Sequence, residues 1–259
     1  MMGWAEYVLV YHLTFPFFPT HPVFCAFELL GWHATLLLTL ASYFRCIFTD
    51  PGGVPRELTA KMSADLAETG ELQTKWCKKC NCYKPDRTHH CSVCKTCVLK
   101  MDHHCPWVNN CVGFRNYKFF CLFLTYIPLL CLWYIIGAVP RIVASHFRLF
   151  SSAELQIMVV MIICVTFGLG LSCFSAAHIG YVFKNVTTLE SFDGERSPYD
   201  LGFKENWRQV FGKSPWLWFV PVANMQGDGL SFPTKNSDLA DIEGDYHTKE
   251  NESLLQNNQ

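Results

Sequence analysis

The sequence predicts an integral membrane, all-α protein with four transmembrane helices and a cytosolic, metal-binding Cys-rich domain between helices 2 and 3. Half of the 259 residues are hydrophobic, and they gather in long apolar blocks. Eight of the fourteen cysteines and four of the ten histidines lie within residues 77–111, with apolar blocks on both sides. Blocks of about 20 apolar residues match the thickness of a bilayer core, and clustered thiols and imidazoles are typical metal ligands.

Helices 1 and 2 are expected within residues 1–48. Residues 4–19 are mostly apolar but short, since a spanning helix needs about 17–25 residues, and an interfacial helix is the alternative. A turn at 19–22 separates this segment from the longer block at 23–48. We therefore expect one marginal span and one complete span here.

Helices 3 and 4 are expected within residues 119–183. Residues 119–140 carry no charge, and neither does the block at 155–183. A short luminal loop at 141–154 joins them. The alternative, a pair of buried helices in a soluble protein, does not suit uncharged blocks of this length.

The charges of the loops orient the four spans. Residues 49–118 carry eleven Lys and Arg, the turn at 19–22 carries none, and the loop at 141–154 carries two. Basic loops stay in the cytosol, so the region 49–118 and both chain termini are expected there. Residues 184–225 then form a cytosolic C-terminal segment, and the polar, acidic tail at 226–259 is expected to be disordered.

The composition excludes several classes of protein. A formal net charge of −1 argues against a nucleic-acid partner. No N-terminal stretch combines a basic region with a small-residue cleavage site, so no cleaved signal peptide is expected. Cysteines that interleave with histidines at Cys-x2-Cys spacing favour metal in a reducing compartment over disulfides.

The window 77–111 holds more than eight candidate metal ligands. Structural zinc takes four thiolate or imidazole ligands in a tetrahedron, and zinc is the default metal for Cys3His sets. Two sites are therefore expected, each contributing on the order of 10 kcal/mol or more to the folding of a region with few apolar residues. Spacing alone leaves sequential and interleaved pairings of the ligands both open.

One thiol in this window has the features of a nucleophile. A neighbouring imidazole can take the proton of the Cys105 thiol, and a carboxylate can orient that imidazole. Asp102, His103 and Cys105 supply these three groups within four residues. His104 should face away and bind metal, because adjacent side chains cannot all point one way. The alternative is that Cys105 is a ninth ligand or a packing residue.

The whole window resembles the DHHC protein S-acyltransferases, also called palmitoyltransferases. The shared pattern covers more than 40 positions, from Cys77 to Phe120, and includes the run Asp102-His103-His104-Cys105. Three further stretches resemble other motifs of the family: Asp50-Pro51-Gly52, Thr187-Thr188-Leu189-Glu190 and residues 206–212.

The resemblance implies two structural zinc ions with interleaved Cys3His ligands. Carried over by position, one set is Cys77, Cys80, His90 and Cys97. The other set is Cys91, Cys94, His104 and Cys111. Asp102, His103 and Cys105 are then the catalytic residues, and Cys82 has no assigned role.

The resemblance also implies the reaction and its partners. Cys105 takes a long-chain fatty acyl group, palmitoyl, from acyl-CoA as co-substrate. The autoacylated enzyme, a lipoprotein intermediate, then passes the group to cysteine thiols of proteins. Those substrates would face the cytosol with membrane-proximal cysteines, and the enzyme would be a multi-pass protein of the Golgi, of other endomembranes or of the plasma membrane.

Candidate substrate contacts lie on both sides of the Asp-His-His-Cys motif. Lys84, Arg87 and His89 can hold the CoA phosphates by charge-assisted bonds, and the alternative is a solvated cationic face. Phe120 and Phe123 can line a cavity for the acyl chain, and the alternative is ordinary helix packing or lipid exposure. Residues expected to tie the C-terminal segment to the catalytic domain are Thr188, Glu190 and Asn206.

Two other classes remain open on the residues alone. A non-catalytic zinc-binding membrane adaptor would leave the Asp-His pair before Cys105 unexplained. A membrane ubiquitin ligase with a RING-like domain needs a second Cys-x2-Cys pair after its histidines, and only Cys111 follows them here.

Overall fold

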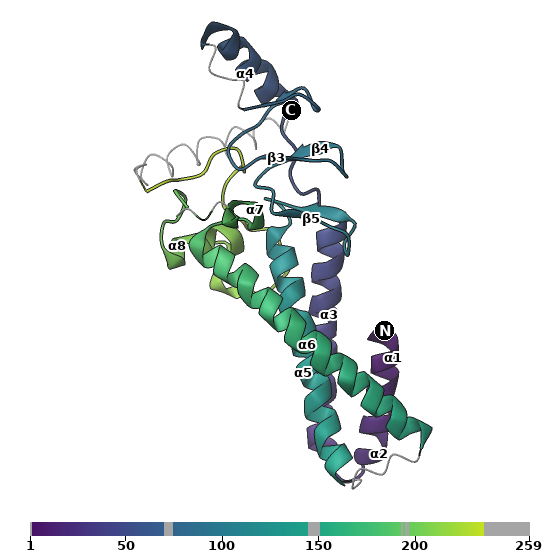
Figure 1. The fold of residues 1–259 in the computed structure, drawn as a ribbon. Helices are drawn as coiled ribbons and strands as arrows, with labels where there is room; N and C mark the ends of the chain where they lie inside the picture. Colours follow the sequence, from purple (N-terminus) through teal and green to yellow (C-terminus); the bar gives the residue numbers. More distant parts are fainter. Residues whose placement is uncertain (1, 70–74, 145–150, 193, 195–196, 236–259) are drawn as a thin grey trace, which may run out of the picture. The chain divides into compact units, whose positions relative to one another are not determined.

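A computed structural model describes residues 2–69, 75–144, 151–192, 194 and 197–235, and it is mostly helical (Figure 1). The chain divides into two compact units. The first contains Met1–Phe44 and Cys121–His178, and the second contains Arg45–Phe120 and Ile179–Gln259.

Three helices are long and apolar enough to cross a membrane, judged by length and composition. They are α3 (Pro22–Phe48), α5 (Tyr117–Ala144) and α6 (Ser152–Lys184), drawn in purple, teal and green in Figure 1. Each contains one of the long apolar blocks at 23–48, 119–140 and 155–183. Helix α3 extends its block by one residue, and α5 and α6 extend theirs by a few. The prediction of three long apolar helices in these blocks is therefore confirmed.

The N-terminal segment differs from the predicted spanning helix at 4–19. It contains α1 (Met2–Tyr7), a π-helix η1 (Val8–Thr14) and α2 (Phe15–Phe17). The described residues thus include three candidate spans rather than four. Sixteen α-helical residues reach about 24 Å, less than a bilayer core of about 30 Å, so this segment is marginal in length and the four-span prediction is not confirmed here.

The first unit has an apolar core with one buried ion pair. Trp32 of α3, Tyr134 of α5 and Cys164 of α6 belong to one buried cluster. Within this unit the Arg141 guanidinium lies 2.7 Å from the Glu28 carboxylate, and both side chains are buried. A buried charge is tolerated when it is paired in this way, so the pair ties α3 to α5.

The second unit contains three short antiparallel hairpins. They are β1–β2 (Trp76–Cys77 and Cys82–Tyr83), β3–β4 (His89–Cys91 and Thr96–Val98) and β5–β6 (His103–Cys105 and Asn110–Val112). These strands were not predicted, and an all-α description is wrong for this region. Strands of two or three residues are too short to show the alternating apolar pattern that identifies a strand.

Two of the hairpins repeat each other at a distance of fourteen residues. Thr88-His89-His90-Cys91 and Asp102-His103-His104-Cys105 each lead into a hairpin. The pairing is equivalent, since His90 faces Cys97 and His104 faces Cys111. The turns match as well, because each contains one residue with a left-handed backbone at the same position. This residue is Lys95 in the first hairpin and Asn109 in the second.

The remaining elements of the second unit surround these hairpins. They are α4 (Arg56–Thr69), α7 (Thr188–Ser191), α8 (Phe203–Phe211) and a 3-10 turn η3 (Pro215–Leu217). The Asn110 amide donates to the carbonyls of Cys46, Ile47 and Thr49, so it caps the C-terminal end of α3. Residues 226–235 contain no helix or strand, and the rest of the predicted tail lies outside the described residues.

Candidate active site and metal centres

Eight Cys and His side chains form two groups of four in the second unit. Within each group the ligand atoms all lie within 4.8 Å of one another. Each group takes a Cys-x2-Cys pair from one turn and a His and a Cys that face each other across the next hairpin. The groups are Cys77, Cys80, His90 and Cys97, and Cys91, Cys94, His104 and Cys111.

The distances between these atoms fit one metal ion per group. The Cys94 and Cys111 sulfurs are 3.5 Å apart, and His104 Nδ1 lies 3.4 Å from the Cys94 sulfur. In the other group, Cys80 Sγ is 3.0 Å from His90 Nδ1. Ligands bound at about 2.0–2.3 Å around tetrahedral zinc would be about 3.5–3.8 Å apart. Both groups can therefore hold a thiophilic ion with little movement.

Asp102 is the centre of a short chain of hydrogen bonds beside these groups. Its side chain is 1% exposed, and its Oδ2 lies 2.6 Å from His103 Nδ1. The Thr188 backbone N–H donates to Asp102 Oδ1 at 2.9 Å, and the Thr188 hydroxyl donates to Oδ2 at 2.8 Å. A carboxylate held on both oxygens fixes the ring of the histidine that it contacts.

His103 and Cys105 shift each other's acidity. Burial lowers the pKa of His103, but hydrogen bonds to Asp102 and Cys105 and the charges of both outweigh it and raise the pKa to about 9. Burial also opposes ionisation of Cys105, but the His103 ring and the backbone N–H groups of Trp107 and Val108 lower its pKa. The pair therefore favours a thiolate beside an imidazolium.

The aromatic residues near this pair differ in burial. The Phe120 ring lies 5.0 Å from the His103 ring, in an edge-on arrangement, and is buried. Trp107, two residues after Cys105, is 82% exposed. Phe123 is in the first unit, where its ring lies 5.1 Å from that of Tyr43.

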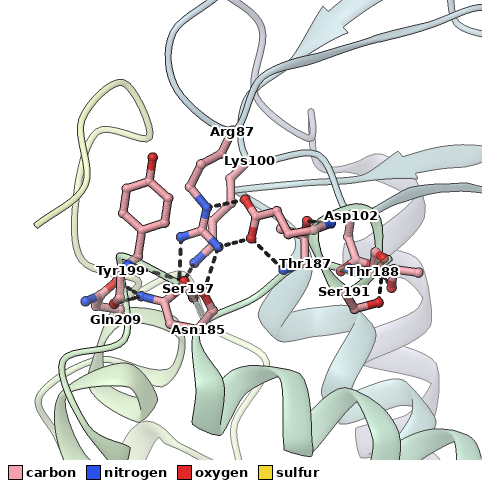
Figure 2. A network of polar contacts seen from close by, with 11 residues as sticks. Arg87, Lys100, Asp102, Asn185, Thr187, Thr188, Ser191, Ser197, Tyr199 and Gln209 are labelled. Carbon is pink, nitrogen blue, oxygen red and sulfur yellow. Dashed lines mark hydrogen bonds and ion pairs between the residues drawn. The ribbon is translucent and has the colours of Figure 1, made fainter. Parts of the chain in front are cut away.

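Arg87 is part of a buried polar network rather than a free cation (Figure 2). Its guanidinium is bonded to both carboxylate oxygens of Glu190 at 2.7 Å and to the side chain and backbone oxygens of Asn185 at 3.0 Å. Burial raises the pKa of Glu190, but Arg87 outweighs it and lowers that pKa. Contrary to the sequence-based expectation, the donors of Arg87 point to protein oxygens rather than toward a phosphate.

Asn185 is the centre of this network, and it was not among the predicted site residues. Its Oδ1 also accepts a bond from Lys100, and its amide donates to the Tyr199 carbonyl and to Gln209 Oε1. It has a left-handed backbone, with φ of 47°, directly after the end of α6. An Asn at a helix end is too common in sequences to identify such a hub.

The other predicted contacts are placed as follows. Lys84 is half-buried beside β2, and His89 is exposed at the start of β3. Asn206 donates to the Phe183 carbonyl near the end of α6 and to Asp200, so it joins α6 to α8. Thr188 and Glu190 contact the Cys-rich region directly, through Asp102 and Arg87.

Comparison with known proteins identifies the class. Residues 70–195 match the family model of the DHHC palmitoyltransferases. The chain is 35% identical to palmitoyltransferase ZDHHC2 of Mus musculus, with 90% of this chain and 73% of that protein covered. It is 36% identical to human ZDHHC20, over 80% of this chain and 66% of that protein. It is 38% identical to an Arabidopsis thaliana protein named "Probable protein S-acyltransferase 12", over 78% of each.

The chain belongs to the DHHC palmitoyltransferase family. It is a protein-cysteine S-palmitoyltransferase, and nothing in the comparisons favours a non-catalytic adaptor.

Proposed function

We propose that this chain transfers a palmitoyl group from acyl-CoA to protein cysteines through an acyl-enzyme on Cys105, with His103 as the acid-base residue and Asp102 as its orienting carboxylate. The supporting observation is the continuous set of bonds from Thr188 through Asp102 and His103 to Cys105. It supplies an activated thiolate, a proton carrier and a fixed ring orientation.

The first step is acylation of Cys105. Its thiolate attacks the carbonyl carbon of the acyl-CoA thioester, a new Cys105 thioester forms, and the bond to the CoA sulfur breaks. The leaving CoA thiolate takes the proton from the His103 imidazolium. Phe120 presents an apolar surface next to His103, which suits the first carbons of the chain.

The second step is transfer to the protein substrate. The neutral His103 accepts the proton of the substrate thiol, whose sulfur attacks the Cys105 thioester. The substrate thioester forms and Cys105 leaves as a thiolate, which restores the starting pair. Because His103 is both acid and base, the hydrogen bond from Asp102 acts in both steps.

The two Cys/His groups would each hold one structural zinc ion. Cys77, Cys80, His90 and Cys97 would bind the first, and Cys91, Cys94, His104 and Cys111 would bind the second. Bound zinc would supply folding free energy to hairpins too short to be stable by themselves. We infer no chemical step on the metal, because each group already offers four protein ligands.

Membrane insertion would place the thiol at the boundary between lipid and water. We propose that the N-terminal segment at 1–48 supplies two membrane helices and that 119–183 supplies two more. Residues 49–118 and 184–225 would face the cytosol with both termini, with 226–259 as a tail. Acyl-CoA, cytosol-facing proteins and the bilayer are the partners proposed, in an endomembrane or the plasma membrane.

Labelling with a clickable palmitoyl-CoA tests the nucleophile. The purified protein should carry a label that hydroxylamine removes, and Cys105→Ala should abolish it. Cys82→Ala is the matched control, because Cys82 belongs to neither Cys/His group and should leave the label unchanged. A hydroxylamine-sensitive label that persists in Cys105→Ala would falsify the assignment, and zinc well below two per chain would refute the scaffold.

A further inference from the structure

A polar cavity lies in the second unit, and Cys105 is not among the residues that line it. It is enclosed by the start of α5, α8 and the segment that follows η3, with about 310 Å³ of unfilled space that is partly open to solvent. The gap between its walls admits one group of about the size of a water molecule. No Asp or Glu is among its lining residues, and the lining residues with polar side chains are Lys100, Tyr117, Lys118, Gln209 and Gln226.

Two amide donors in these walls have no hydrogen-bond partner. Nε2 of Gln209 and Nε2 of Gln226 are both buried and unpaired among the described residues. The Gln209 side chain is 8% exposed, and its Oε1 already accepts from Asn185, so its NH2 group is the end left over. The Gln226 backbone N–H bonds to the Gln209 carbonyl, which brings the two residues together. A buried donor without an acceptor is unfavourable, so these two indicate a missing acceptor.

A buried cation in the same walls has no carboxylate partner in the described part of the chain. Lys118 is 1% exposed, and its ammonium donates to the Leu217 and Val222 carbonyls and to Asn224 Oδ1, all neutral. Lys100 lies 5.5 Å from the face of Phe232 and bonds Asn185. Buried charges are normally paired. The Glu190 carboxylate is paired with Arg87 and also interacts with the charge of Lys100, so it is not a partner of Lys118.

We propose that this cavity is a binding site for a small inorganic anion of about the size of chloride. The anion would accept from Gln209 and Gln226 and would balance the charge of Lys118. It would thereby hold the segment around Gln226 against α8 and the first turn of α5. The site is separate from the acyl-transfer residues, so it stands whether or not the acyl-enzyme is formed on Cys105.

Thermal unfolding of the full chain in nanodiscs tests the site, with chloride exchanged for gluconate at constant ionic strength. The wild type should show a saturable rise in Tm of about 3–6 °C when chloride is ten times its dissociation constant. Equal Tm values in chloride and gluconate would mean that the cavity holds only water, and this would overturn the proposal.

Two substitutions of one residue sharpen the test. Gln226→Glu places a carboxylate in the site, so its Tm in gluconate should match the wild-type value in chloride, and chloride should no longer raise it. Gln226→Met removes one donor at similar side-chain length, so it should reduce the rise in Tm that chloride causes. This variant serves as the test if Gln226→Glu does not fold. Lys213→Met, which removes an exposed charge outside the cavity, should keep the full shift. A full shift in both Gln226 variants would refute the site.

Discussion

The two repeated hairpins, β3–β4 and β5–β6, have nearly the same backbone but differ in the roles proposed for their side chains. In β3–β4 the run His89-His90-Cys91 gives one ligand to each Cys/His group, and in β5–β6 the run His103-His104-Cys105 gives one ligand and the proposed nucleophile. The middle histidine, His90 or His104, is a candidate metal ligand in both runs and faces a candidate ligand cysteine across its hairpin. The difference lies in the residues on either side of it.

The thiols of the two hairpins are stabilised in the same way. Burial opposes ionisation of Cys91, but the backbone N–H groups two and three residues later, of Val93 and Cys94, help to lower its pKa. The N–H groups of Trp107 and Val108 occupy the same positions relative to Cys105. Cys94 supplies a second thiol and Val108 does not, so the turn after Cys105 favours a thiolate but offers no paired metal ligand.

The residue before each His-His pair completes the contrast. Thr88 is buried, and its hydroxyl has no partner among the described residues. At the equivalent place, Asp102 bonds both His103 and Thr188. One carboxylate and one missing cysteine therefore separate the hairpin proposed only to bind metal from the hairpin proposed to carry the nucleophile.

The largest expected effect comes from removing a metal ligand that joins both hairpins. His104→Ala should lower the zinc content from two to one per chain and abolish palmitoylation, because each site contributes on the order of 10 kcal/mol to folding. Elemental analysis and the labelling assay measure both. His89→Ala, at the histidine outside either group, should keep two zinc ions. Two zinc ions in His104→Ala would contradict the ligand assignment.

Making the second hairpin like the first should slow the acylation of Cys105 strongly without unfolding the protein. Asp102→Thr copies Thr88 and should slow acylation of Cys105 by about 10³–10⁴-fold, because His103 loses its orienting charge. Single-turnover labelling gives the rate, and zinc should remain at two per chain. An unchanged rate would show that the carboxylate is not what distinguishes the hairpins.

The next largest effect is expected from breaking the Arg87–Glu190 ion pair, which links the hairpins to the C-terminal segment. Arg87→Met leaves Glu190 partly buried and unpaired, at a cost of about 3–5 kcal/mol in unfolding free energy. Adding Glu190→Gln should recover part of this loss, and no recovery would argue against direct coupling.

The same ion pair should make stability depend on pH. Because Arg87 lowers the pKa of Glu190 in the folded state, the stability contributed by the pair is complete above the unfolded pKa and is lost as the pH falls through the folded pKa. Thermal unfolding of the wild type and of Glu190→Gln across pH measures this loss.

The smallest effect is expected at Thr188. Thr188→Val removes the hydroxyl bond to Asp102 but keeps the backbone N–H bond, so acylation should slow by about 10-fold. Ser191→Ala is the matched control, because its hydroxyl bonds the Thr188 carbonyl and not Asp102. If both variants slow the reaction equally, Thr188 has only a structural role in α7.

Local patterns were enough to predict a large part of this molecule. Long uncharged blocks predict α3, α5 and α6, because spanning a bilayer sets a minimum length of apolar residues. The spacing of the Cys-x2-Cys pairs predicts a metal-binding region, and the Asp102-His103-His104-Cys105 run identifies the family. The N-terminal segment is marginal in length, and it is not among the three candidate spans of the described residues.

Only the tertiary structure decided the partners of buried polar groups. Arg87 has the same charge whether it faces a phosphate or a carboxylate, and its partner Glu190 is 103 residues away. Asn185, Gln209 and Gln226 look ordinary in the sequence and meet only because the C-terminal segment folds back. The sequence by itself determined which residues can cross a membrane, bind metal or form a thiolate. The fold determined which of them are paired, because burial makes each polar group depend on neighbours that local pattern does not specify.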